Sequence, residues 1–289
     1  MQYPKISIVT PSYNQGQYIE ETIQSVLGQN YPNLEYIIID GGSTDGTVEI
    51  IRRYEPQLAY WVSERDRGQY HAINKGFERS TGEIMAWINS DDKYCPWAFQ
   101  VVAAIFSSVP EVEWLTTSTR LFWNERGELV RASYSPGFAR TWFYRGWHLG
   151  NRPGFKGWIQ QESTFWRRSL WEKAGGRVDD SLQYAGDFEL WARFWQHADL
   201  VVTACPLGGY RYHAAQKMRQ RESCNYYAEA EQVLARYRHE TIHHPVGLWL
   251  LHQMLRLTGR GWRRFGSRLA QVDYDHTSGS WQYGFKRCV

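Results

Sequence analysis

Apolar residues in the first half of the chain follow two patterns that alternate along the sequence. Short continuous apolar runs predict buried strands, and apolar residues spaced three or four positions apart predict helices. The runs lie at residues 6–10, 34–39, 58–62 and 84–88. The helical segments lie at residues 18–27, 47–54 and 69–79. This alternation predicts an α/β protein with a mostly parallel sheet flanked by helices.

The second half of the chain is less regular but keeps both patterns. Further helices are expected at residues 96–108, 168–174, 187–197 and 226–239. Further strands are expected at residues 114–119, 160–165 and 200–203. Residues 121–158 are rich in Gly, Pro, Arg and aromatic residues and predict a long irregular segment. A segment of this kind in a compact domain is usually functional or mobile.

The last part of the chain has a different character. A strongly apolar helix is expected at residues 245–257, and arginines alternate with Trp262 and Phe265 just beyond it. Such a basic and aromatic amphipathic stretch can lie on an anionic membrane surface. The alternative is a helix that packs on the domain and exposes its basic face to water. We therefore expect a helical, basic and aromatic C-terminal appendage at residues 223–289, with a possible peripheral membrane contact.

Polar residues follow each predicted strand of the first half. The carboxyl ends of parallel strands share one edge of the sheet, where α/β proteins bind ligands. Asn14, Asp40, Asp66 and Asp91 should therefore converge. The strand at 84–88 is followed by two adjacent carboxylates, whose oxygen atoms suit Mg²⁺ or Mn²⁺. The alternative is an acidic turn, because Asn, Ser and Asp are also turn residues.

Composition narrows the classes of protein. With 289 residues and 43% hydrophobic residues, the chain can form one large domain, or a domain with an appendage. A net charge of +3 is too small to indicate a nucleic-acid partner. The four cysteines form no C-x-x-C pair, so neither a zinc site nor a disulfide framework is indicated. The first residues lead directly into a strand, and no apolar run reaches about 20 residues. We therefore expect a cytoplasmic protein with reduced thiols.

Two common phosphate-binding motifs are missing from the sequence. The glycines of residues 41–46 do not have the G-x-G-x-x-G spacing, and no G-x-x-x-x-G-K-[ST] motif is present. Without a phosphate-binding loop of either kind, a bound diphosphate would need a metal ion. That requirement again favours the carboxylates after the strand at 84–88.

Five motifs in order resemble those of family-2 glycosyltransferases, and the resemblance covers roughly residues 4–215. They are the runs at residues 8–14, 39–47, 74–76, 89–92 and 186–191. The resemblance implies the GT-A fold, a Rossmann-like nucleotide-sugar-binding sheet. It also implies a nucleotide-sugar-binding half at residues 1–119 and an acceptor-binding half at 120–222.

The resemblance assigns the nucleotide-sugar donor to the loops after the first strands. Pro11, Tyr13 and Asn14 match the loop that borders the nucleotide. Asp40 matches the carboxylate that hydrogen-bonds uracil or a similar base. Asp66 and Arg67 fall where members of the family approach the nucleoside.

The same resemblance implies a metal site. Residues 89–91 match the D-x-D motif of the family, with Asn89 in place of the first Asp. Asp91 is then the direct ligand of Mn²⁺ or Mg²⁺, and Asp92 supports it beside the donor. His213 is a candidate additional ligand, because imidazole tolerates Mn²⁺. A single histidine is more often structural.

Asp187 matches the catalytic base of the family. A base near the acceptor hydroxyl takes its proton as the hydroxyl attacks the anomeric carbon, which inverts the configuration at that carbon. The alternative is an acidic residue that stabilises the start of a helix. Gln161 and Glu162 match the segment that lines the acceptor side and are expected to bind sugar hydroxyls.

These inferences predict a metal-dependent inverting glycosyltransferase that uses a UDP- or TDP-linked sugar. The expected acceptor is a glycan or a lipid-linked glycan, reached at the inner face of the cell membrane. Two alternatives remain open at this stage. One is nucleotidyl transfer on the same fold, although the sequence offers no basic triphosphate-binding loop. The other is a catalytically silent sugar-binding subunit, which Asn89 favours slightly.

Overall fold

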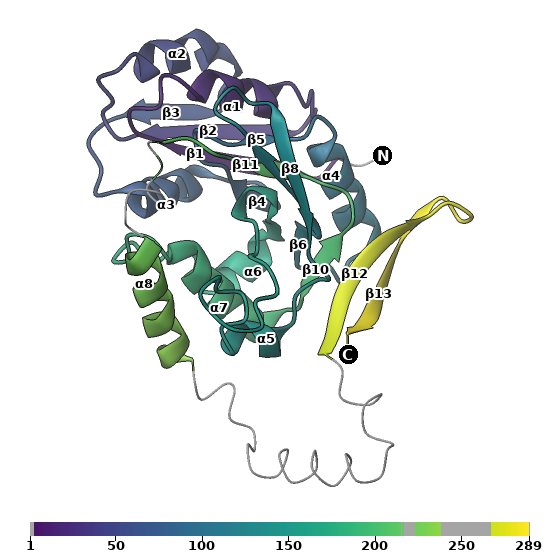
Figure 1. The fold of residues 1–289 in the computed structure, drawn as a ribbon. Coiled ribbons are helices and arrows are strands. Elements are labelled where there is room, and N and C mark those ends of the chain that lie inside the picture. Colours follow the sequence, from purple (N-terminus) through teal and green to yellow (C-terminus); the bar gives the residue numbers. More distant parts are fainter. Residues whose placement is uncertain (1–2, 215, 217–222, 238–266, 289) are drawn as a thin grey trace, which may run out of the picture.

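A nine-stranded sheet forms the centre of the computed structural model, which describes residues 3–214, 216, 223–237 and 267–288 (Figure 1). The strand order is β13-β12-β10-β6-β9-β4-β1-β2-β3. Its strands are β1 (Ile6–Ser12), β2 (Leu34–Asp40), β3 (Tyr60–Ser63), β4 (Ile84–Trp87), β6 (Trp114–Thr117), β9 (Phe165–Arg167), β10 (Leu200–Thr203), β12 (Ser267–Asp275) and β13 (Ser280–Cys288). Strand β9 runs antiparallel to both of its neighbours, and β1, β2, β3 and β4 pair in parallel. The predicted α/β fold with a mostly parallel sheet is confirmed.

Helices lie on both sides of the sheet, as the sequence pattern predicts. In Figure 1, α1 and α2 lie above strands β1–β3 and α3 lies below them. The α-helices are α1 (Ile19–Leu27), α2 (Thr47–Tyr54), α3 (Gln69–Arg79), α4 (Ala98–Ser108), α5 (Arg140–Tyr144), α6 (Arg168–Lys173), α7 (Gly186–His197) and α8 (Ser223–Arg236). Two 3-10 turns accompany them, η1 (Glu55–Gln57) and η2 (Gln161–Ser163). Because helices cover both faces, every residue of β1 is buried.

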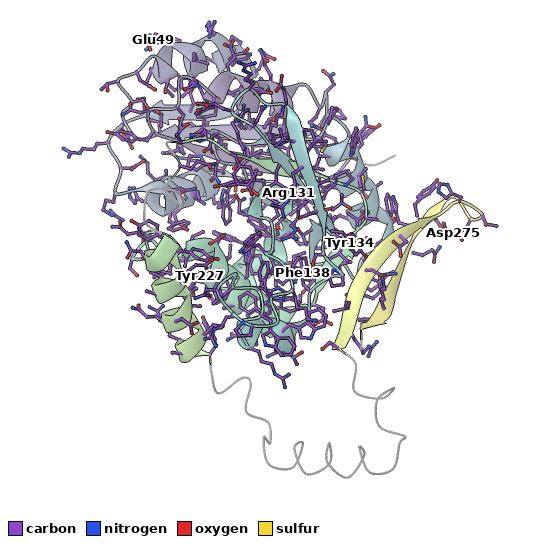
Figure 2. All side chains as sticks on the ribbon, viewed as in Figure 1. Glu49, Arg131, Tyr134, Phe138, Tyr227 and Asp275 are labelled. Carbon is purple, nitrogen blue, oxygen red and sulfur yellow. The ribbon has the colours of Figure 1, made fainter. Side chains whose placement is uncertain are left out.

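Aromatic side chains fill much of the space between the sheet and α7. Figure 2 shows side chains occupying the space between the ribbons. The rings of Trp87 and Trp191 stack with their centroids 5.9 Å apart, and Trp166 packs edge-on against both. Many of the tryptophans therefore form the core that fixes α7 against β4.

A second, four-stranded sheet lies over one edge of the first. Its order is β5-β11-β7-β8, with β5 (Lys93–Tyr94), β11 (Gly208–Arg211), β7 (Thr119–Trp123) and β8 (Leu129–Tyr134). The expectation of an irregular segment at 121–158 is therefore wrong in part, since it contains most of β7, all of β8 and α5. Strand β8 is largely exposed, so its sequence lacks the alternation that marks a half-buried strand.

Two other expectations also need correction. Residues 160–165 form the turn η2 and the start of β9, because their polar side chains bond to neighbouring backbone groups. The C-terminal appendage is not wholly helical, since β12 and β13 form a hairpin whose first strand pairs in parallel with β10. The predicted helix at 245–257 and the arginines beyond it lie outside the described residues.

The helix predicted at 226–239 is present as α8, which begins three residues earlier than expected. Within the described residues, no helix is both long enough and apolar enough to cross a membrane. The division into units at 1–222 and 223–289 stays a prediction, although the hairpin joins the large sheet.

Candidate active site

A cavity of about 630 Å³ opens where the loops after β1, β2, β3 and β4 meet. We call it the donor cavity. Its walls come from Pro11, Ser12, Tyr13, Gln15, Gly41, Gly42, Arg65, Asp66, Gly68, Gln69, Ala72, Asn89, Ser90, Asp91, Tyr210, His213 and Gln216. The parallel register of β1 and β2 ends with Ser12 opposite Asp40, so the loops that follow lie side by side. The loops predicted to converge do so.

Asn14 connects two of these loops and does not line the cavity wall. Its backbone N–H donates to Ser43 Oγ at 2.7 Å, and its side-chain Oδ1 accepts from the N–H of Thr44 at 2.9 Å. Its φ of 50° lies in the left-handed region, which Asn tolerates better than most residues. Pro11, near the end of β1, and Tyr13 of this loop line the donor cavity, and their contact with a nucleotide stays a prediction.

Asp40 lies below the donor cavity, where it is fully buried. Its carboxylate accepts hydrogen bonds from the N–H groups of Gly42 and Ser43 and from the hydroxyls of Ser43 and Ser63. These bonds occupy both carboxylate oxygens and hold the loop after β2. A direct contact between Asp40 and the base stays a prediction, and Gly41 and Gly42 are the residues of this loop that face the cavity.

The loop after β3 presents one of its two expected residues, Asp66, to the donor cavity. Asp66 lines the donor cavity, and its Oδ1 accepts from the N–H of Gly68 at 2.8 Å. A Cβ at Gly41 would lie only 2.8 Å from Asp66 Oδ2, so a glycine lets the two loops approach. Arg67, by contrast, is exposed and pairs with Asp180 at 2.9 Å. Arg65 is the cation of this loop that lines the cavity, and Arg67 does not.

The candidate metal ligands Asp91 and His213 lie in contact. Asp91 Oδ2 is 2.8 Å from His213 Nε2, and both residues line the donor cavity. The His213 ring packs on Tyr18, with the centroids 4.4 Å apart. Within the described chain, no cluster of three or more His, Cys, Asp or Glu residues could hold a metal ion. A carboxylate and an imidazole are ligand types that Mn²⁺ accepts, and a metal site at this pair stays a prediction.

Asn89 and Asp92 lie on either side of Asp91 in the sequence, and they bond to each other. Asn89 Nδ2 donates to Asp92 Oδ2 at 3.2 Å, and Asn89 Oδ1 accepts from Gln69 Nε2 at 2.6 Å. Asp92 is fully buried, and burial, followed by the charge of Asp91, holds its pKa well above the usual range. Asn89 lines the donor cavity, whereas Asp92 lies behind it in a supporting position.

Arg211 fixes the backbone of the metal motif from β11, and nothing in the sequence pattern indicated this role. Its N–H donates to Asp92 Oδ1 at 2.8 Å, and its Nε donates to the carbonyl of Asp91 at 2.5 Å. Its guanidinium also pairs with Glu21 at 2.5 Å. Because β11 begins with two glycines, its sequence does not indicate the strand that positions Arg211.

A second cavity, of about 400 Å³, adjoins the first. We call it the acceptor cavity. Gln69, Asn89 and Tyr210 line both cavities. The other lining residues are Tyr70, Trp87, Arg120, Phe122, Trp158, Ile159, Gln160, Gln161, Glu162, Gln183, Tyr184, Asp187, Tyr212 and Tyr226. The predicted base, Asp187, and the predicted acceptor-side residues, Gln161 and Glu162, are among them.

Asp187 lies in the first turn of α7, and its Oδ1 accepts from the N–H of Phe188 at 2.7 Å. Burial raises the pKa of Asp187 to about 6. The pKa of Glu162 is raised to about 7, also by burial, and a hydrogen bond with Asp92 acts in the opposite direction. Gln161 Nε2 donates to the carbonyl of Trp87 at 2.6 Å. Glu162 thus connects the acceptor cavity to Asp92, which lies behind the donor cavity.

The family model described as Glycosyl transferase family 2 matches residues 7–164. The putative teichuronic acid biosynthesis glycosyltransferase TuaG of Bacillus subtilis is 44% identical over 94 residues, which are 32% of this chain and 37% of TuaG. Uncharacterized glycosyltransferase RP339 of Rickettsia prowazekii is 26% identical over 213 residues, 74% of this chain and 65% of its own length. The chain thus matches little more than a third of TuaG.

Solved structures share the fold. Residues 1–349 of S. aureus TarS in complex with UDP-GlcNAc match with a TM-score of 0.59 and 18% identity, covering 89% of this chain and 79% of that one. The mannosyltransferase PcManGT from Pyrobaculum calidifontis, in complex with GDP-Man and Mn²⁺, matches with a TM-score of 0.56 and 21% identity. That match covers 90% of this chain and 76% of PcManGT. The fold is that of GT-A glycosyltransferases, and the chain belongs to glycosyl transferase family 2.

Proposed function

We propose that the protein is a metal-dependent inverting glycosyltransferase that moves a sugar from a nucleotide-sugar to a hydroxyl group of a glycan. One observation carries this proposal. The Asp91–His213 pair lies on the wall of the donor cavity, and Asp187 lies in the adjoining acceptor cavity. Two cavities that share a wall allow a donor and an acceptor to meet there.

The donor cavity can hold a nucleotide with its diphosphate toward Asp91 and His213. Residues of the loops after β2 and β3 border the part of the cavity beyond this pair, and we assign the nucleoside to them. A divalent cation there would offset the charge that grows on the departing nucleoside diphosphate. The solved complexes of TarS with UDP-GlcNAc and of PcManGT with GDP-Man and Mn²⁺ support a nucleotide-sugar and a metal in this fold. For this chain we propose a UDP- or TDP-linked sugar.

Asp187 acts as the general base in this proposal. With a pKa of about 6, it is mostly ionised at pH 7 and is more basic than an ordinary aspartate. It takes the proton of the acceptor hydroxyl while that oxygen bonds to the anomeric carbon and the bond to the diphosphate breaks. A single displacement of this kind inverts the anomeric configuration.

The acceptor cavity favours a sugar over a small polar substrate. Aromatic rings of Trp158, Tyr184 and Tyr226 line it, and such rings pack against the C–H faces of sugars. The name of TuaG refers to teichuronic acid biosynthesis, which supports a polysaccharide acceptor. A lipid-linked form of it, and a membrane contact through the C-terminal tail, belong to the same proposal.

Release of nucleoside diphosphate tests the proposal. The full chain is incubated with UDP- and TDP-sugars, Mn²⁺ and a glycan acceptor mixture, and the Asp187→Asn variant is compared with the wild type. We expect the variant to lose release by a factor of about 100 or more while it still binds UDP. Normal turnover by this variant would show that Asp187 is not the base. Pyrophosphate produced from a nucleoside triphosphate would instead indicate nucleotidyl transfer.

A further inference from the structure

Arg120 projects from β7 into the acceptor cavity, and the proposed reaction gives it no role. It faces Ser133 across the β7–β8 pair, and Phe122 faces Arg131 two pairs further along. Alternate residues of a strand point to the same side, so these four side chains share one face of the small sheet. Arg131 lies on this face near the middle of the molecule (Figure 2).

The guanidinium of Arg120 is buried, and two of its three nitrogen atoms have no hydrogen-bond partner among the described residues. Arg120 is 6% exposed, and its Nε and Nη1 atoms bond to no group in the described part of the chain. The hydroxyl of Ser133, directly across the strand pair, is also buried and unpaired there. A buried donor without an acceptor has an energetic cost, which is larger when the donor is charged. A second group that fills this position would remove that cost.

Two other arginines, the buried Arg211 and the half-buried Arg193, have acidic partners. Arg211 pairs with Glu21 at 2.5 Å, and Arg193 pairs with Glu189 at 2.7 Å. The pKa of Arg120 is lowered first by burial and then by the nearby Arg131 guanidinium, which adds to the positive charge. Among the described residues, no carboxylate forms an ion pair with Arg120. An anion that a ligand brings into this cavity would pair with this cation.

The surroundings of Arg120 suit a sugar that carries such an anion. The guanidinium lies 5.6 Å from the centre of the Trp158 ring, which is 40% exposed. On the other side, the rings of Phe122 and Tyr212 stack with centroids 5.4 Å apart. Gly157 leaves room for the guanidinium, since a Cβ there would lie 3.0 Å from Arg120 Nη1.

We propose that Arg120 forms an oxyanion subsite in the acceptor cavity, which binds a carboxylate or phosphate group carried by the acceptor glycan. The proposal rests on the proposed function, because it identifies the acceptor as an anionic saccharide. The fork of an arginine binds a carboxylate or a phosphate through two parallel hydrogen bonds. Trp158 then packs on the sugar ring next to the anion.

Binding of small sugars to the full chain tests this subsite. The probes are methyl β-D-glucuronide and glucose 6-phosphate, each compared with its neutral counterpart, methyl β-D-glucoside or glucose. We expect at least one charged probe to bind about tenfold or more tightly than its neutral counterpart, as a hydrogen bond to a charged group implies. Preference for the glucuronide indicates a uronic-acid acceptor, and preference for the phosphate indicates a phosphate-bearing one.

Three variants make the test specific. Arg120→Gln should remove the difference between charged and neutral probes, and Arg120→Lys should keep part of it, because the charge remains without the fork. Arg131→Gln is the matched control on the same face and should keep the difference within about threefold. Each variant is also tested for binding of UDP with Mn²⁺. Binding shows that the variant is folded, and it tests the proposed function separately from the subsite.

Two results would overturn the proposal. One is a wild type that binds charged probes no more tightly than neutral ones, including a failure to bind either. The other is an Arg120→Gln variant that keeps the preference for the charged probe. If UDP binding fails while the charged probes bind through Arg120, the proposed function is wrong and the anion subsite stands.

Discussion

Asp187 shows how one side chain acquires its chemistry from its position. It starts a helix, where an acidic residue is common, but it also faces a cavity walled by aromatic rings. Burial raises its pKa to about 6. We expect kcat/KM to fall tenfold per pH unit below about pH 6, as the base becomes protonated, and to level off above it. A pH profile of the transfer reaction checks this, and a limb near pH 4 would assign the titration to another group.

The same raised pKa has a consequence for stability. The folded state binds the proton of Asp187 more tightly than the unfolded state does, so ionisation weakens folding as the pH rises from about 4 through about 6. Asp187→Asn removes this effect. We expect the variant to unfold at a higher temperature than the wild type at pH 8, and the two midpoints to approach each other near pH 4. Equal midpoints at pH 8 would contradict the burial of this charge.

At the residue scale, the sequence identified which residue types belong to the site better than it identified which side chains face the cavity. The resemblance offered His213 as a candidate additional ligand beside Asp91, and the two side chains are 2.8 Å apart. The sequence also pointed to Arg67, whereas Arg65 lines the donor cavity. Which side chain of a loop faces inward depends on the backbone of that loop, and the local pattern does not specify it. Arg120 was missed because an arginine in an aromatic-rich segment gives no signal of burial.

Helix α8 illustrates control at the scale of an element. The carboxylate of Glu229 accepts hydrogen bonds from the N–H groups of Gln183, Tyr184 and Ala185, just before α7 begins. Its negative charge also raises the pKa of Asp187, after the larger effect of burial. This helix therefore both holds and tunes the start of α7.

A charge-neutral substitution tests that role. Glu229→Gln should move the acid limb of the pH profile below that of the wild type, because the repulsion that disfavours ionised Asp187 is gone. Transfer should also slow, since a glutamine oxygen cannot accept all of these bonds. Glu231→Gln is the control on the same helix, where Glu231 pairs with Arg152 at 2.5 Å. A Glu229→Gln limb that coincides with that of the control would show that α8 does not act on Asp187.

Whether an element could be predicted depended on its burial. Helix α3 matches its prediction at both ends, and the apolar runs of β1 and β2 are unmistakable because both faces of the sheet are covered. Strand β8 is largely exposed and β11 begins with two glycines, so neither resembles a strand in sequence. Tertiary pairing creates such strands, and local propensity does not.

At the scale of the whole molecule, the C-terminal hairpin completes the sheet. Strand β12 pairs with β10, and its residues Leu269 and Val272 are 1% and 0% exposed. Without it, β10 would present an unpaired edge. Sequence patterns favoured a helical appendage because the apolar and basic residues just before the hairpin dominate the tail.

A buried charge in the hairpin tests whether it belongs to the same folding unit. Val272→Asp should lower the free energy of unfolding of the whole chain by about 3 kcal/mol or more, because an unpaired carboxylate would be buried. Asp273→Asn, at an exposed neighbouring position, should change it by less than about 0.5 kcal/mol. Denaturant unfolding of both variants provides the comparison. An unchanged main transition in Val272→Asp would show that the hairpin folds as a separate unit.

The most direct test of the central claim is calorimetric titration of UDP into the full chain, with and without Mn²⁺, for the wild type and for Asp91→Ala. The account predicts that Mn²⁺ tightens UDP binding about tenfold or more in the wild type and has no effect in Asp91→Ala. Equal binding of UDP with and without Mn²⁺, or an undiminished effect of Mn²⁺ in Asp91→Ala, would contradict a metal-assisted donor site at Asp91 and His213.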